Sequence, residues 1–381
     1  MSELQTYFGE TQNIVRASVK KFVAQEIAPH INTWEEENTF PRELYTKAGD
    51  AGILGIGHPE KFGGTGADIF TKIAASEELM RSGSGGLVAS LGSLDIGLPP
   101  VYKWGAESLK SKIVPDVIAG RKICALAITE PSGGSDVANI KTTATKDGDH
   151  YIINGSKTFI TSGQRADYYT VAVRTGTDGY GGISLILVER DCAGFTRGKN
   201  LKKTGWWASD TAELFFDNVR VPASNLIGAE NAGFFAIMSN FEAERLSLCV
   251  MANTTSELAL EHALAYVKER NAFGRPIGKF QVLKHKLAEM ATQLEASKTL
   301  TYRLAARMEA GQSVVKEISM AKNFATTTSD KLTYDAVQLF GGMGFMREAP
   351  VERLYRDNRI LSIGGGTYEI MNEVIAKQMG L

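Results

Sequence analysis

The sequence is poor in several features that would assign it to a class at once. Its three cysteines, Cys124, Cys192 and Cys249, lie too far apart for a zinc site or a dense disulfide framework, and so few fit a reducing compartment. Its five histidines are scattered, so we expect no metal site. The formal net charge is −1, which gives no overall attraction to nucleic acid or to an acidic membrane.

Long apolar runs are absent as well. No stretch approaches the roughly 18 apolar residues that a membrane-spanning helix needs. The opening "MSELQTYFGETQNIV" contains acidic residues and lacks the apolar core of a signal peptide. We therefore expect a cytoplasmic protein without a membrane span, or a mitochondrial matrix protein if the chain is a mature eukaryotic form. No Walker motif is present, and no G-x-G-x-x-G follows an early strand, which argues against the common nucleotide-binding folds.

The spacing of apolar residues divides the 381 residues into three parts, which we predict as domains. Residues 1–123 show helical spacing, as in "TQNIVRASVKKFVAQEI". Residues 124–230 hold β-prone runs such as "YYTVAVRTG", "GGISLILVE" and "TAELFFDNVRVP", and Asn154-Gly155 predicts a hairpin turn. Residues 231–381 return to long periodic helices, beginning at "FFAIMSNFEAERLSL", which indicates a bundle.

Several motifs each allow two interpretations when they are considered alone. "ITEPSGGSD" is a strand that runs into a turn rich in hydroxyls, and a plain turn is the simpler interpretation. The aromatic residue of "FITSG" fits an ordinary core. "ERNAFGRPIGKFQ" places Arg270 at a helix end, where it either holds a phosphate or is a solvated cap. The later glycine pairs and triplets are either helix stops or points where a ligand approaches the main chain.

Together, "ITEPSGGSD", "FITSG", "FFDNVRVP", "ERNAFGRPIGKFQ" and "LFGGMGF" stand in the order found in the acyl-CoA dehydrogenase family, which the chain resembles over essentially its whole length. The resemblance implies an α+β fold with an N-terminal helical domain, a central β-barrel-like domain and a C-terminal four-helix bundle. It also implies FAD-dependent oxidation of an acyl-CoA to a trans-2-enoyl-CoA, with electrons passed to electron-transferring flavoprotein. The implied assembly is a homotetramer, built as a dimer of dimers, that binds no nucleic acid.

The resemblance also assigns cofactor residues. One side of the flavin ring would be lined by Leu126, Ile128 and Thr129, and the other by Phe159, Ile160 and Thr161. The bundle of a neighbouring subunit would hold the rest of the FAD, and Thr367 and Glu369 would lie near a cofactor. The bundle residues implied in this role are Arg270, Phe273, Gln281, Gln338, Gly341 and Gly342.

The catalytic base is the point at which this chain departs from many family members. Their Glu-Gly-Thr triplet carries the base, but this chain reads "GGGT" and has Gly365 in that position. Another branch, which includes isovaleryl-CoA and long-chain enzymes, carries its base in an "E-R-L" context, and "NFEAERLSL" supplies Glu244 there. We therefore predict Glu244 as the base, while the main-chain N–H of Gly365 and a flavin ribityl hydroxyl polarise the thioester carbonyl. Glu242, Arg245 and Ser135 are the expected substrate contacts.

Some alternatives stay open at this point. An oxidase-like flavoenzyme that uses oxygen, and a flavin-binding family member without catalysis, both fit the same motifs. Gly92, Ser93 and Gly97 leave room in the predicted acyl pocket, so the chain length and branching of the substrate are not determined. Asp95 in the same stretch is interpreted as a helix cap.

Overall fold

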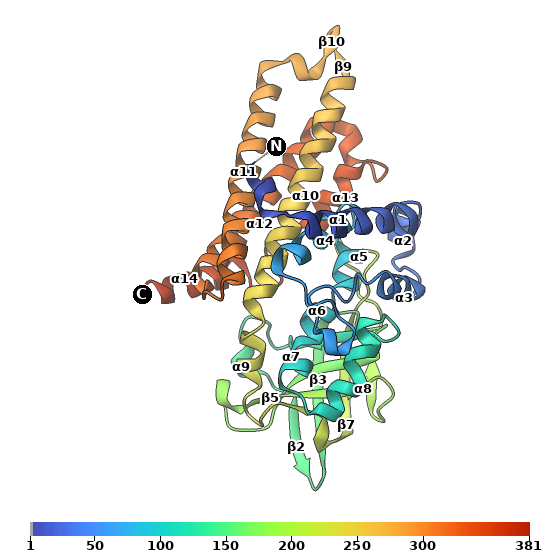
Figure 1. Cartoon of the computed structure of the whole chain (residues 1–381), viewed down its shortest axis with the longest axis vertical. Coiled ribbons are helices and arrows are strands. Elements are labelled where there is room, and N and C mark those ends of the chain that lie inside the picture. Colours follow the sequence, from blue (N-terminus) through green and yellow to red (C-terminus); the bar gives the residue numbers. More distant parts are fainter. Residues whose placement is uncertain (1–2) are drawn as a thin grey trace.

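The computed structural model describes residues 3–381, and its first third is helical, as predicted. The later helices of this part lie beside the strands of the next part in Figure 1, and both contribute to one hydrophobic core. The helices are α1 (Glu10–Phe22), α2 (Ile31–Glu37), α3 (Glu43–Asp50), α4 (Ile69–Met80), α5 (Gly85–Leu91), α6 (Leu94–Gly97), α7 (Pro99–Trp104) and α8 (Glu107–Ile118).

The middle part forms one eight-stranded sheet with the order β6-β7-β3-β2-β4-β5-β8, and β1 pairs in parallel with β4. The β-prone runs of the sequence are confirmed as β4, β5 and β7, and most of their buried side chains are Val, Ile, Leu or aromatic. The strands are β1 (Cys124–Ala127), β2 (Thr143–Asp147), β3 (His150–Thr161), β4 (Tyr168–Arg174), β5 (Ile183–Glu189), β6 (Phe195–Arg197), β7 (Thr211–Pro222) and β8 (Leu226–Ile227).

The predicted hairpin turn at Asn154-Gly155 is wrong. Both residues lie inside β3, at a register shift against β7, and they form a bulge. A Cβ on Gly155 would lie 2.6 Å from the Thr142 hydroxyl, so the close approach of Thr142 explains the glycine. The Asn154 side chain accepts a hydrogen bond from the N–H of Asn218 on β7, at 2.8 Å. The turn into β3 is made instead around Gly148.

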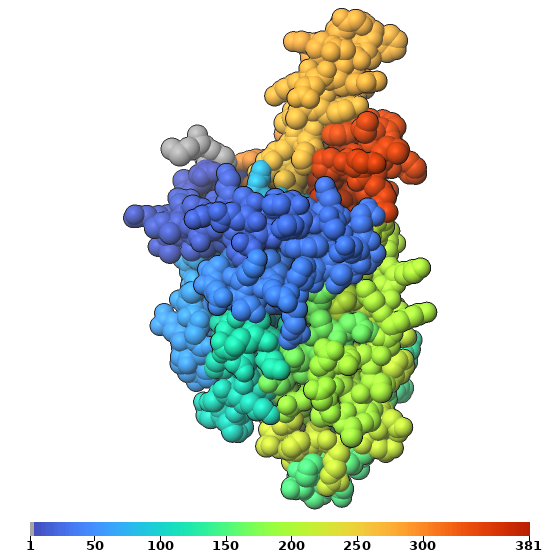
Figure 2. All heavy atoms as spheres, turned by 90° about the vertical axis from the view of Figure 1, so that its right-hand side faces the viewer, coloured from blue at the N-terminus to red at the C-terminus, as the bar shows by residue number. Residues whose placement is uncertain are grey.

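The last part is a helical bundle in which the long helices α10, α11 and α12 pack together. The hairpin of α10 and α11 extends beyond the rest of the molecule and ends in a small two-stranded tip (Figures 1 and 2). The predicted first long helix is divided, because the chain turns at Ser239-Asn240. The elements are α9 (Gly233–Met238), α10 (Phe241–Glu269), β9 (Asn271–Ala272), β10 (Arg275–Pro276), α11 (Gln281–Glu309), α12 (Val315–Phe340), α13 (Pro350–Asn358) and α14 (Tyr368–Gln378).

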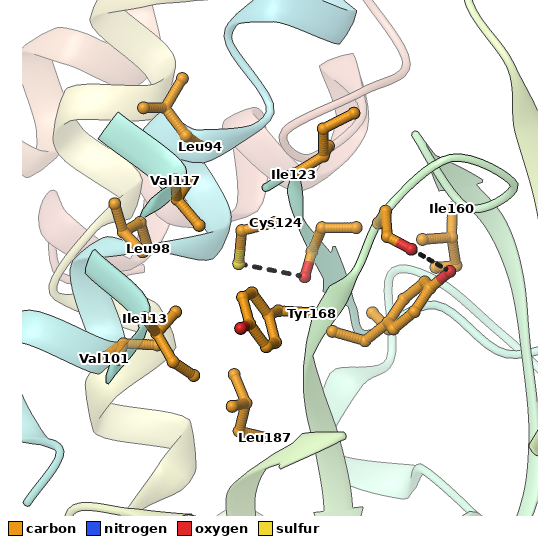
Figure 3. Packing of buried hydrophobic residues seen from close by; sticks show 14 of the residues in the cluster. Leu94, Leu98, Val101, Ile113, Val117, Ile123, Cys124, Ile160, Tyr168 and Leu187 are labelled. Atoms are coloured by element: carbon orange, nitrogen blue, oxygen red, sulfur yellow. Dashed lines mark hydrogen bonds between the residues drawn. The ribbon is translucent and has the colours of Figure 1, made fainter. Parts of the chain in front are cut away.

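The core between the N-terminal helices and the sheet is continuous (Figure 3). Leu98 and Val101 of the helical part and Leu187 of the sheet are fully buried in it. Each such side chain contributes about 1.5–3 kcal/mol when it is removed from water. The two parts therefore form a rigid support for the residues at the ends of β1 and β3.

A buried carboxylate joins all three parts. Asp357 on α13 accepts hydrogen bonds from the N–H of Trp206, at 2.6 Å, and from the N–H of Gly85, at 3.1 Å. Its neighbour Arg356 forms an ion pair with Glu35 of α2 at 3.0 Å. These contacts hold the bundle against the N-terminal helices and the sheet. In residues 3–381, no helix is long and apolar enough to cross a membrane.

Candidate active site

The two stretches predicted to flank a flavin ring are adjacent in the structure. The N–H of Thr158 on β3 donates a hydrogen bond to the carbonyl oxygen of Thr129, just beyond β1, at 2.8 Å. Thr129 and Thr161 are both partly buried, Thr129 two residues beyond the end of β1 and Thr161 at the last residue of β3. Leu126 and Ile128 are partly buried beside them.

Phe159 has the geometry of a residue that covers a ligand. Its φ is +58°, a left-handed value that costs a bulky residue energy, and its side chain is 69% exposed. Backbone strain that presents a large aromatic ring to solvent is typical of a binding site. The exposed ring and the nearby hydroxyls of Thr129 and Thr161 fit the apolar face and the polar edge of an isoalloxazine.

Ile160 does not fit the role predicted for its side chain. The side chain is 3% exposed and lies within the core of the sheet (Figure 3). β3 is irregular at this point, with a register shift against β7 between Lys157 and Ile160, and the burial of the Ile160 side chain keeps it from a ligand that the exposed Phe159 ring would cover. Only the main chain of Ile160 is available at the ring face.

Glu130, in the "TEP" turn, is a buried structural carboxylate that the sequence did not identify. Its oxygens accept hydrogen bonds from Lys157 Nζ at 2.8 Å and from the N–H groups of Lys141 and Thr142 at 2.6 and 2.9 Å. Burial alone would raise the pKa of Glu130, but Lys157 and these hydrogen bonds lower it to about 2. The ion pair of Glu130 and Lys157 therefore fixes the turn next to Thr129.

Glu244 and Gly365 are brought together, although 121 positions separate them in the sequence. A Cβ built on Gly365 would lie 3.3 Å from Oε1 of Glu244 and 2.5 Å from Cδ1 of Leu248. The Glu244 carboxylate on α10 thus borders the space where a side chain at position 365 would begin. Gly365 has φ +65°, a conformation that favours glycine.

The polar groups of this pair have no partners in the described chain, residues 3–381. The Glu244 carboxylate accepts no hydrogen bond there, and the N–H of Gly365 donates none. Burial raises the pKa of Glu244 above its usual range, and the positive charges of Arg245 and Lys322 oppose that rise. A carboxylate with a raised pKa beside a free N–H has the features of a general base next to a carbonyl-binding donor.

The predicted substrate residues differ in exposure. Arg245 is 6% exposed and donates to Ser319 Oγ at 3.3 Å, while its buried Nε has no acceptor in residues 3–381. Glu242 is partly buried and accepts a hydrogen bond from Ser313 at 3.4 Å. Ser135 lies on an exposed turn. Glu242 and Arg245 share the first turns of α10 with Glu244, whereas Ser135 belongs to the β-domain side.

Two predictions for the acyl-pocket stretch need correction. Gly97 does not leave room, because a Cβ there would lie 3.0 Å from Cys124 Sγ; the glycine lets α6 approach β1. Asp95 is not a helix cap. It lies within α6, and its carboxylate pairs with Lys72 and with buried His58, each at 3.2 Å.

The other predicted cofactor residues lie in the bundle, away from this chain's own sheet. The α10–α11 hairpin carries Arg270 and Phe273 at its tip, where Phe273 is 93% exposed, at the opposite end of the molecule from β2 and β7 (Figure 1). Thr367 caps α14 by accepting a hydrogen bond from the N–H of Ile370 at 3.3 Å. The remaining predicted residues are all exposed: Gln281, Gln338, Gly341, Gly342 and Glu369.

Comparison with known proteins identifies the family. Three family models match: the N-terminal domain of acyl-CoA dehydrogenase over residues 9–121, the middle domain over residues 125–219 and the C-terminal domain over residues 231–380. The chain therefore belongs to the acyl-CoA dehydrogenase family, has the α+β fold of that family, and is an oxidoreductase. The domain boundaries after residues 123 and 230 stay predictions.

Similar proteins cover almost all of the chain. An acyl-CoA dehydrogenase of Bacillus subtilis is 42% identical over 97% of this chain and 98% of its own length. The mitochondrial long-chain specific acyl-CoA dehydrogenase of Sus scrofa is 40% identical over 99% of this chain and 88% of its own length. A solved structure of a probable acyl-CoA dehydrogenase from Mycobacterium abscessus has a TM-score of 0.97 and 48% identity, covering 98% of this chain and 100% of the other.

Two further solved structures bear on the redox chemistry. A glutaryl-CoA dehydrogenase from Mycobacterium smegmatis, solved with FADH2, has a TM-score of 0.93 and 29% identity, covering 99% of this chain and 96% of the other. A structure described as the electron transferring flavoprotein of Acidaminococcus fermentans has a chain with a TM-score of 0.93, 37% identity and 98% coverage of both. The predicted cofactor of the family, FAD, is confirmed.

Proposed function

We propose that this protein oxidises an acyl-CoA thioester at its α and β carbons, with Glu244 as the base, and forms a trans-2-enoyl-CoA. One observation carries the proposal: the Glu244 carboxylate accepts no hydrogen bond in residues 3–381 and borders the side-chain position that Gly365 leaves empty. The position of the carboxylate compensates for the missing side chain of Gly365. The N–H of Gly365 keeps the main-chain part of the task.

The residues of the chain account for the proton step. Glu244 accepts the α-proton (pro-R by the stereochemistry of the family) as the bond from the α-carbon to hydrogen breaks. The N–H of Gly365 donates a hydrogen bond to the thioester oxygen, on which negative charge develops. Phe159, Thr129 and Thr161 cover and orient the flavin. FAD, when bound, supplies the two-electron acceptor for the hydride that leaves the β-carbon.

We further propose a dimer in which each flavin is shared between two subunits, within a homotetramer. Exposed Arg270 and Phe273 lie at the hairpin tip, and the Thr129 region lies on the sheet, so one flavin cannot contact both within one chain. A tip that extends from the molecule is suited to reach a second copy. Electron-transferring flavoprotein is the proposed acceptor of the electrons, in line with the family resemblance.

The test is an anaerobic titration of the purified yellow protein with straight-chain and branched acyl-CoAs of increasing length, followed by loss of flavin absorbance. Bleaching with one clear optimum supports the function and defines the acyl class. Acyl-CoAs with long straight chains are titrated first, because the Sus scrofa relative is long-chain specific. Bound FAD that no thioester bleaches would overturn the proposal. Hydrogen peroxide formed at the rate of turnover in air would make the protein an oxidase.

A further inference from the structure

A lysine with no part in the reaction described above lies directly beneath the glycine segment. Lys322 on α12 is fully buried, and its Nζ donates a hydrogen bond to the carbonyl oxygen of Gly366. Gly366 is the residue after Gly365, so this bond holds the peptide that adjoins the proposed oxyanion donor. A fully buried lysine is rare in proteins, because its charge must be compensated.

The groups around Lys322 connect it to the base as well. The titratable groups that act on its ammonium are the Cys249 thiol, Arg245 and Glu244, all of α10. The segment from Gly364 to Thr367 contributes only main-chain groups. Burial raises the pKa of the Cys249 thiol to about 12, so it stays neutral. Glu244 is therefore the only negative group among those that act on Lys322.

The neighbouring position on α12 provides an internal comparison. Asn323 donates hydrogen bonds to the carbonyl oxygen of Tyr368 at 3.1 Å and to the Asn372 side chain at 3.0 Å. Asn323 and Lys322 thus hold adjoining parts of the same segment. Of these two residues, only Lys322 is charged, and its positive charge acts on Glu244 together with that of Arg245.

We propose that Lys322 is a positioning residue that fixes the Gly365 N–H through the Gly366 carbonyl and keeps Glu244 ionised through its charge. The inference rests on the proposed function, in which these two groups act on the thioester. Lys322 itself touches neither substrate nor flavin in this account. Its effect passes through a hydrogen bond on one side and through a charge on the other, and the two effects can be measured separately.

The test uses three variants of the full-length FAD protein. Lys322→Met removes both the donor and the charge, Lys322→Gln keeps a donor without the charge, and Asn323→Ala weakens the neighbouring anchor without changing charge. The rate of flavin reduction is measured against pH in single-turnover experiments. Hydrogen exchange of the peptide covering residues 362–370 is followed by mass spectrometry.

We expect both Lys322 variants to shift the acidic limb of the rate profile to higher pH by about one unit, because the charge that lowers the pKa of Glu244 is lost. Lys322→Met should also reduce the limiting rate about tenfold or more, because small misplacements of catalytic groups are costly. Its 362–370 peptide should exchange faster than that of Lys322→Gln. Asn323→Ala should speed exchange without moving the pH profile.

An unchanged pH profile in both Lys322 variants would contradict the proposed effect of the Lys322 charge on Glu244, which is the electrostatic part of the proposal. Unchanged hydrogen exchange in Lys322→Met would contradict the proposed anchoring of the segment through Gly366. If Lys322→Met does not fold, Lys322→Gln alone decides the electrostatic part. A wild-type protein that no acyl-CoA reduces would contradict the proposed function instead. The exchange comparison would still decide whether Lys322 holds the segment.

Discussion

Two glutamates, one on each side of the site, differ in the hydrogen bonds that they accept: Glu130 is buried, and Glu244 is partly buried. Glu130, on the sheet side, is bound by Lys157, by two main-chain N–H groups and by Ser132. Glu244, on the bundle side, accepts no hydrogen bond in the described part of the chain. The pKa of Glu130 is lowered to about 2, whereas burial raises the pKa of Glu244.

The difference shows which carboxylate supports the structure and which is available for chemistry. A carboxylate that is fully hydrogen-bonded cannot take up a proton without losing those bonds, so Glu130 stays ionised and holds a turn. A carboxylate left without donors binds a proton more readily, which a base requires. Glu130 therefore stabilises the turn on the sheet side, while Glu244 on the bundle side keeps a carboxylate without hydrogen-bond donors.

Moving the base should produce the largest change. Glu244→Gly should slow flavin reduction about 10³-fold, the usual range for loss of a general base. Adding Gly365→Glu should raise the rate of flavin reduction at least about tenfold above that of Glu244→Gly, because a Cβ at position 365 lies 3.3 Å from the position of the lost Glu244 oxygen. Adding Leu248→Ala removes the 2.5 Å overlap and should increase the recovery. Rapid-mixing absorbance measures all three, and no recovery in FAD-loaded variants would contradict the geometry.

Breaking the ion pair on the sheet side should mainly affect stability. Lys157→Met leaves the buried Glu130 carboxylate uncompensated, and we expect a loss of about 3–5 kcal/mol in the free energy of unfolding. Denaturant unfolding followed by circular dichroism measures it. The control is Lys112→Met, which breaks the exposed 2.6 Å pair with Glu189 and should cost less than about 1 kcal/mol. Equal losses of unfolding free energy in Lys157→Met and Lys112→Met would contradict a special structural role for the buried ion pair.

The two glutamates should also lose their effects at different pH values as the solution is acidified. The pKa of Glu130 is lower in the folded protein than its ordinary value of 4.5, so its stabilisation is present above about pH 4.5 and is lost as the pH falls toward 2. The pKa of Glu244 is raised, so flavin reduction should fall as the pH drops through that raised value, well before the fold is lost. The two profiles are measured on the same preparation, and coincident midpoints would contradict the distinction.

The smallest expected effect is a gain in stability. Ionised Glu244 destabilises the fold, because a group with a raised folded pKa contributes stability that is lost as the pH rises through that pKa. Glu244→Gln should therefore stabilise the protein at neutral pH by about 0.5–2 kcal/mol. Thermal unfolding at pH 5 and pH 8 checks the direction. A variant that is less stable at pH 8 than the wild type would contradict the account.

The sequence predicted the part of the site that local patterns encode. The strand and helix order and the turn next to Thr129 follow from motifs that lie in contiguous stretches, whereas the pairing of Glu244 with Gly365 joins distant positions. The pairing needed the family resemblance, because "EAER" alone indicates an ordinary solvated helix face. Its spatial closeness is a finding of the structure.

The parts that were missed depend on partners far along the chain. Lys157 and Lys322 are single lysines within regular elements, and no local pattern separates a buried lysine from a solvated one. The bulge at Asn154-Gly155 depends on Thr142 and Asn218, which no turn rule includes. Asp95 was interpreted from its own helix, while its partners, Lys72 and His58, lie on other elements.

The most direct test of the central claim is a single-turnover comparison of wild type, Glu244→Gln and Glu242→Gln with the acyl-CoA that bleaches the wild type best. FAD content is measured first in each protein. We expect Glu244→Gln to hold FAD but to be reduced at least about 10³-fold more slowly, while Glu242→Gln stays within about tenfold of the wild type. Rapid reduction of FAD-loaded Glu244→Gln would show that the base lies elsewhere.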